Sequence, residues 1–149
     1  MTPRVATAGD LDAIAALERE IFPDDAWPRD KLEDDLHSDY AHFLVAERGE
    51  SIAGYAIAQH LPGNDVADIQ NIAVVEAHRG EALGATLLDA LVEWCESRHA
   101  TAIMLEVRAD NEPAQSLYAS RGFVTIATRP GYYQPAGVDA FVMRREVTR

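Results

Sequence analysis

One turn of this sequence has the residue types of an anion-binding site. It joins an expected strand to an expected helix and consists of Arg79, Gly80, Glu81, Ala82, Leu83 and Gly84. Backbone N–H groups at a helix start, together with the helix dipole, favour a bound phosphate. The glycine spacing is neither that of a dinucleotide-binding loop nor that of a P-loop, so a plain strand-to-helix connection explains the turn equally well.

A carboxylate on an expected strand is a second candidate for chemistry. Alternation over residues 101–107 places Ile103, Leu105 and Val107 on one strand face and Met104, Glu106 and Arg108 on the other. Taken alone, this pattern favours a solvent-facing ion pair between Glu106 and Arg108.

Metal chemistry and a cysteine nucleophile find little support. The histidines are scattered without ligand spacing, at His37, His42, His60, His78 and His99. Cys95 lies on the leucine-rich face of an expected helix, which predicts a buried core residue. We therefore expect no metal site and no cysteine nucleophile.

The elements that must position these residues follow from periodicity and capping signals. We expect helices at 11–21, from Pro28 past Leu36, at 83–99 and at 111–122, and strands at 41–48, 52–60, 66–75, 101–107, 123–128 and 138–146, with a loop at 129–135. Thr7 and Asp10 have capping-box spacing before the first helix. This order predicts one mixed α/β domain with a single sheet over residues 1–149.

Composition bounds the class of protein. The chain has 149 residues, 48% of them hydrophobic, which is enough to form one hydrophobic core without disulfide bonds or structural metals. A net charge of −12 disfavours direct nucleic-acid binding, and no apolar run is long enough to span a membrane. One cysteine and the absence of a signal-peptide pattern predict a cytoplasmic protein.

The acidic charge is concentrated in the first third of the chain. Residues 1–50 hold 13 acidic and 5 basic side chains, a net charge of −8. The densest part contains Asp24, Asp25, Asp30, Glu33, Asp34, Asp35 and Asp39. This segment would attract a cationic partner, although a solvated helix face that keeps the protein soluble explains it as well.

Three blocks of the sequence resemble the GNAT superfamily of N-acetyltransferases. They are residues 71–74 (Asn-Ile-Ala-Val), the turn at 79–84, and the stretch from Asn111 through Leu117-Tyr118 to Gly122-Phe123. The addition of Leu105-Glu106-Val107-Arg108 and Tyr132-Tyr133 is similar to the RimI type, which acetylates the N-terminal alanine of small-subunit ribosomal protein 18. The resemblance implies a mixed central sheet with splayed parallel strands flanked by helices, and acetyl-CoA as co-substrate.

The resemblance also implies a role for each matching residue. The main chain of Ile72, Ala73 and Val74 would pair with the pantetheine arm, and the amides of residues 79–84 would hold the pyrophosphate. Asn111 matches a cofactor-contacting position, and it equally fits a helix N-cap.

Within the same resemblance, Glu106 matches the general base and Tyr118 the general acid. The alternative for Tyr118 is packing beside Leu117. Tyr132 and Tyr133 match a loop that lines the peptide site. The opposing loop would contain Phe22, Pro23 and Trp27.

Ala82 departs from the family pattern, which has glycine there, and this puts tight acetyl-CoA binding in doubt. The expected acceptor is the N-terminus of a basic ribosomal protein, acetylated by direct attack in a ternary complex with acetyl-CoA. Two alternatives remain: an acetyltransferase for a small cationic amine, and a catalytically weak acyl-CoA-binding regulatory domain.

Overall fold

The computed structural model describes residues 2–75 and 82–147 of the chain. Its elements, in chain order, are β1 (Arg4–Val5), the short 3-10 helix η1 (Ala8–Asp10), α1 (Leu11–Ile21), α2 (Arg29–His37), β2 (Ala41–Arg48), β3 (Ser51–Gln59), β4 (Val66–Val74), α3 (Leu83–Ser97), β5 (Ala102–Arg108), α4 (Glu112–Ser120), β6 (Val124–Tyr133) and β7 (Val138–Glu146). The expected helices and strands are present, whereas β1 and η1 were not predicted and β6 is longer than expected.

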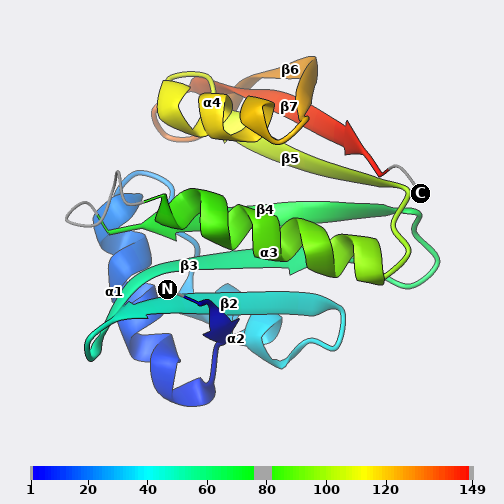
Figure 1. Ribbon diagram of the computed structural model, residues 1–149. Helices are drawn as coiled ribbons and strands as arrows, with labels where there is room; N and C mark the ends of the chain where they lie inside the picture. The colour runs from blue at the N-terminus through cyan, green and yellow to red at the C-terminus, as the bar shows by residue number, and fades with distance from the viewer. Residues whose placement is uncertain (1, 76–81, 148–149) are drawn as a thin grey trace.

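The strands of the described residues form one sheet in the order β1-β2-β3-β4-β5-β7-β6. Every neighbouring pair is antiparallel except β4 and β5, which are parallel. These two strands pair only from Val66 to Asp68, opposite Ala102 to Met104. Beyond that point they diverge, as Figure 1 shows. The mixed sheet with splayed parallel strands is confirmed, and its opening lies at the carboxyl ends of β4 and β5.

Two hydrophobic clusters cover the two faces of the sheet. Leucines of α3 and the ring of Tyr118 on α4 pack on one face, and α1 and α2 pack on the other (Figure 1). Cys95 is fully buried in the α3 cluster, and burial raises the pKa of its thiol to about 12. The prediction of a core cysteine is therefore confirmed. A thiol that stays protonated is also a poor nucleophile.

The start of α1 and η1 is fixed by the predicted capping box. The backbone N–H of Thr7 donates to the Asp10 carboxylate at 2.7 Å, and Arg4 donates two further bonds to the same carboxylate. These donors, of which Arg4 contributes most, lower the pKa of Asp10 to about 2. A carboxylate at a helix start is also favoured by the helix dipole.

A bulge in β4 decides which side chains face the opening. Ile57 of β3 lies opposite Asn71, whereas the next residue, Ala58, lies opposite Ile69, so Gln70 is the extra residue. Ile69 packs in the α3 cluster before the bulge, and Ala73 packs in the α1–α2 cluster after it. The bulge therefore inverts the side-chain alternation along β4.

The expected loop at 129–135 is wrong for its first five residues. β6 continues through Arg129 to Tyr133, and Tyr133 lies opposite Val138 of β7. A register shift between Arg129 and Tyr133 accommodates Pro130, which cannot donate a ladder hydrogen bond. The proline and glycine here mark an irregular strand rather than a loop.

Candidate active site

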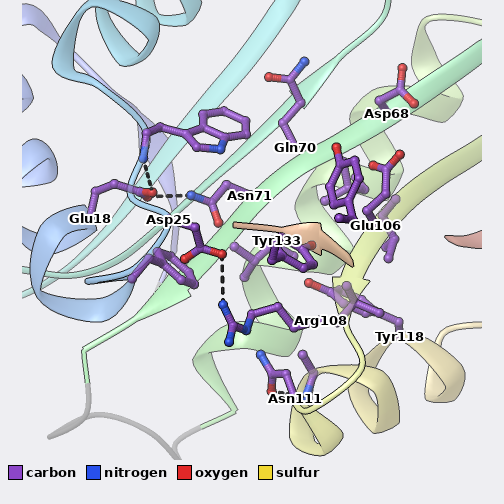
Figure 2. Close-up of a pocket in the computed structure, with 18 of the residues that line it drawn as sticks. Glu18, Asp25, Asp68, Gln70, Asn71, Glu106, Arg108, Asn111, Tyr118 and Tyr133 are labelled. Carbon is purple, nitrogen blue, oxygen red and sulfur yellow. Dashed lines mark hydrogen bonds and ion pairs between the residues drawn. The ribbon is translucent and has the colours of Figure 1, made fainter. Parts of the chain in front are cut away.

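The opening between β4 and β5 is a cleft of about 430 Å³. Its walls come from β4, β5, α4, the end of β6 and the loop between α1 and α2 (Figure 2). A second pocket of about 460 Å³ adjoins it. The two pockets share the lining residues Phe22, Asp25, Ile72, Arg108 and Asn111. Two ligands could therefore enter separately and meet at these shared residues.

Glu106 lies on the β5 wall of the cleft, with 34% of its side chain exposed. Its carboxylate points toward the end of the cleft that contains Asp68 (Figure 2). The ion-pair partner of Glu106 is Arg129, at 3.7 Å, and not Arg108 as the strand alternation predicted. Such a long contact between two partly exposed side chains is weak, so it leaves the carboxylate able to accept a proton.

Arg108 instead joins β5 to the loop after α1. Its guanidinium donates to both oxygens of Asp110, at 3.0 and 3.1 Å, and to Asp25 at 3.1 Å. The guanidinium also lies 5.4 Å from the ring centre of Tyr133. Arg108 is therefore engaged by two carboxylates and an aromatic ring, which explains why it does not reach Glu106.

Tyr118 packs in the hydrophobic core and also lines the cleft. Its ring is 8% exposed and packs edge-on against Phe123, with ring centres 6.1 Å apart. Tyr118 also lines the cleft, and its hydroxyl points inward (Figure 2). Burial raises the pKa of Tyr118 to about 12. Full proton transfer to a thiolate of pKa about 8.5 would then be uphill by about 5 kcal/mol, which favours hydrogen-bond donation.

Four aromatic side chains face the cleft from opposite sides. Tyr132 and Tyr133 stand perpendicular to each other with ring centres 5.1 Å apart. Phe22 and Trp27 lie in the loop between α1 and α2, and Lys31 covers the Trp27 ring at 4.7 Å. Burial, followed by the neighbouring Tyr132 and the negative charge of Glu106, raises the pKa of Tyr133. The predicted substrate-site residues are thus brought together around one cleft.

The β4 residues predicted to bind acetyl-CoA lie at the junction of the two pockets. Ile72 lines both, and Ala73 and Val74 line the second. The β5 pairing of β4 ends at Asp68, so the following part of this strand edge opens onto the cleft. Asn111 lines both pockets and caps α4, because its side chain accepts from the Ala114 N–H at 3.2 Å.

The start of α3 has one unusual backbone conformation. Ala82, the N-cap residue, has φ 61° and ψ 18°, in the left-handed region that favours glycine. Leu83 is buried, and Gly84 lies close to Val74 and Leu117. The other predicted phosphate-binding residues of this turn, Arg79, Gly80 and Glu81, lie outside the described residues.

Sequence reasoning missed several polar residues of the cleft. They are Glu18, Asp25, Lys31, Asp68, Gln70, Asn71 and Arg108. One signal was available: Glu18 falls on the apolar face of α1, at helical spacing from Leu11 and Ile14. A charged residue at a core position predicts a buried polar contact.

The acidic segment is partly neutralised from within. Asp35 is buried and accepts two bonds from Lys31, at 2.7 and 2.8 Å, while Asp25 pairs with Arg108.

In residues 2–75 and 82–147 no group of three or more metal-binding side chains occurs. No helix of this described part is long and apolar enough to cross a membrane.

Comparison with known proteins gives a consistent set of relatives. A family model described as "Acetyltransferase (GNAT) family" matches residues 11–123. N-alpha-acetyltransferase RimI of Mycobacterium tuberculosis is 34% identical over 143 residues, which cover 94% of this chain and 89% of that protein. The ribosomal protein bS18-alanine N-acetyltransferase of Escherichia coli K12 is 33% identical over 138 residues, which cover 90% of this chain and 89% of that protein.

A crystal structure of the Escherichia coli ribosomal-protein alanine N-acetyltransferase matches the fold with a TM-score of 0.88. It is 27% identical, and the match covers 99% of this chain and 94% of that one. A longer relative also exists: this chain spans 39% of the length of a Mycobacterium leprae protein to which it is 40% identical over 144 residues.

Proposed function

Because this chain belongs to the acetyltransferase (GNAT) family, we propose that it transfers an acetyl group from acetyl-CoA to the N-terminal α-amine of a protein. The proposed acceptor is the N-terminal alanine of small-subunit ribosomal protein 18. The name of the Escherichia coli relative supports this acceptor, and the name of the Mycobacterium tuberculosis relative supports acetylation of an α-amine.

The observation that carries the proposal is the cleft between the diverging strands. Glu106 and Tyr118 both line it, and aromatic side chains face it from two sides. Because β4 and β5 separate beyond Asp68, the cleft is open on this side, and an extended peptide end can enter it. The adjoining pocket along Ile72, Ala73 and Val74 would take the pantetheine arm of acetyl-CoA, since the β4 edge offers main-chain groups there.

The reaction requires a base that deprotonates the amine and a hydrogen-bond donor that stabilises the leaving thiolate. An α-amine has a pKa of about 7.7–8.0, so most of it is protonated and unreactive at neutral pH. The Glu106 carboxylate would remove that proton directly or through water. The amine nitrogen then forms a bond to the acetyl carbon, the carbon–sulfur bond breaks and the coenzyme A thiolate leaves, and the surplus proton on the nitrogen passes to water to give the neutral amide. Tyr118 would stabilise the leaving thiolate by donating a hydrogen bond, and both substrates must be bound together.

Asn111 and the start of α3 would complete the cofactor side of the site. Asn111 caps α4 with its side chain while it lines both pockets. Ala82 already holds the left-handed conformation that a glycine would adopt in the phosphate turn.

A small cationic amine is a second candidate acceptor because four carboxylates line the cleft: Glu18, Asp25, Asp68 and Glu106. Burial, followed by the charge of Glu106, raises the pKa of Asp68, which indicates a negative potential at this end of the cleft. A bound cation would relieve that potential whether it is an ammonium group or a basic peptide.

The test is incubation of the protein with acetyl-CoA and a panel of acceptors, followed by mass spectrometry. The panel contains a basic peptide that begins with alanine, the same peptide with a blocked N-terminus, and polyamine and aminoglycoside amines. Acetylation of the free alanine peptide alone is the expected result. Acetylation of the small amines only would support the second candidate, and acetyl-CoA binding without turnover would support a regulatory domain.

A further inference from the structure

The Glu18 carboxylate is a buried junction between three parts of the chain. Glu18 is 1% exposed, on the last turns of α1. Its Oε1 atom accepts from the Tyr55 hydroxyl and from the Asn71 side-chain amide, both at 2.6 Å. Its Oε2 atom accepts from the Trp27 backbone N–H at 2.9 Å. The donors therefore come from β3, from β4 and from the loop before α2.

This arrangement fixes geometry rather than neutralising charge. A buried carboxylate is costly unless its oxygens accept hydrogen bonds, and three of roughly four acceptor positions of Glu18 are filled. All three donors are neutral, and none of the ion pairs found among the described residues includes Glu18. Burial, followed by the neighbouring Glu18 carboxylate, raises the pKa of the Tyr55 phenol.

The elements that Glu18 joins are two walls of the cleft. Asn71 lies on β4 directly before Ile72, which lines both pockets. Trp27 belongs to the loop between α1 and α2, whose aromatic side chains also line the cleft. Figure 2 shows Glu18 between Asn71 and this loop, on the far side of the cleft from Glu106.

We propose that Glu18 is a positioning residue that holds the Trp27 loop against β4 and so sets the width of the acceptor end of the cleft. This inference rests on the proposed function for the identity of the acceptor. The tether itself does not depend on that function, because it is given by the three hydrogen bonds.

The variant Glu18→Gln separates this role from general packing. Glutamine keeps the size of the side chain but replaces one oxygen with an NH₂ group, which cannot accept. Oε1 holds two bonds and Oε2 only one, so the carbonyl is expected to stay with Tyr55 and Asn71. The NH₂ group then lies next to the Trp27 N–H. Because both groups are donors, the hydrogen bond that holds the loop is lost while the other two remain.

The expected kinetic result is a split between KM and kcat. The KM for the alanine peptide should rise by about ten-fold or more, the scale of one lost hydrogen bond to a charged group. The kcat at saturating peptide should stay within about two-fold of wild type, and the Kd for acetyl-CoA should change less than the peptide KM, because Glu106 is unchanged and the β4 wall of the second pocket keeps the Asn71 bond to residue 18. Equal losses in peptide KM, acetyl-CoA affinity and kcat would overturn the proposal in favour of a general structural role.

A second readout follows the loop without any turnover. A Trp94→Phe background leaves Trp27 as the only tryptophan of the chain. In that background, Glu18→Gln should increase acrylamide quenching of Trp27 fluorescence and shift its emission to longer wavelength. Tyr55→Phe is the matched control: it removes a donor from the same carboxylate but leaves the Trp27 bond, so quenching should not change. Unchanged quenching in Glu18→Gln would overturn the proposal.

Amide hydrogen exchange covers the case in which Glu18→Gln does not fold. In the wild-type protein the Trp27 amide should exchange more slowly than that of Ala26, its neighbour in the same loop. Equal exchange at both amides would overturn the proposal. If the wild-type protein does not acetylate the alanine peptide, the proposed function fails, while the fluorescence and exchange measurements still decide the role of Glu18.

Discussion

The variant Ala82→Gly tests whether the turn before α3 is strained by its alanine. Ala82 has φ 61° and ψ 18°, and its carbonyl accepts the first helical hydrogen bond from the Thr86 N–H at 3.1 Å. A non-glycine residue in the left-handed region costs roughly 1–2 kcal/mol. Glycine removes that cost but loses roughly 0.5–1 kcal/mol more backbone entropy on folding.

The net expectation is a gain of about 0.5–1 kcal/mol in the free energy of unfolding. For a chain of this size, 1 kcal/mol corresponds to roughly 2–4 °C in Tm. Glycine would instead be unfavourable by up to about 1 kcal/mol if Ala82 lay in the first helical turn. The structure does not meet that condition, because Ala82 is the N-cap residue and its backbone is left-handed.

The assay is thermal and chemical denaturation of the ligand-free protein, with Ala13→Gly as the control. Ala13 is exposed within α1, so glycine there should lower stability by about 1 kcal/mol. A Tm that falls in both variants would refute the reasoning about the turn. Calorimetric titration of the same proteins measures the effect on the cofactor site, for which several-fold tighter acetyl-CoA binding by Ala82→Gly remains the expectation, by analogy with a contact at a charged ligand.

Four further substitutions test the site and the fold. Glu106→Gln should lower kcat by roughly 10²–10⁴ with unchanged acetyl-CoA binding, and part of the loss should be recovered at high pH, where the amine is already neutral; full activity at pH 7 would remove Glu106 from the mechanism. Tyr118→Phe should slow turnover while the Tm changes little, and the phenol that titrates near pH 12 should disappear from the ultraviolet titration. Asp10→Asn should flatten the acid-dependence of stability: the pKa of Asp10 is lowered to about 2 in the folded state, so its contribution is present above its unfolded pKa of about 4 and is lost as the pH falls toward 2. A wild-type stability that is flat between pH 4 and 2 would contradict this. Gly54→Ala should destabilise the protein by roughly 1–3 kcal/mol, because the new Cβ would lie 2.8 Å from a backbone carbonyl of β4; a stability equal to wild type, measured by urea denaturation, would show that β4 can move.

Local sequence signals predicted the features that depend on neighbouring residues. Alternation in β5 predicted that Leu105 is buried and that Glu106 is exposed, and both are confirmed. The capping box at Thr7 and Asp10 was likewise predicted from spacing alone. Such signals survive because a strand period of two and a helix period of 3.6 are local properties of the chain.

The hydrogen-bond and ion-pair partners of the polar cleft residues could be seen only in the tertiary structure. Glu18 bonds to Tyr55 and Asn71, 37 and 53 positions away, and Arg108 bonds to Asp25 across 83 positions. The bulge in β4 turns Asn71 toward α1 by inverting the side-chain alternation along this strand. No local period encodes these contacts, since they depend on where the diverging β4 and β5 leave space and on which distant side chains can satisfy a buried charge.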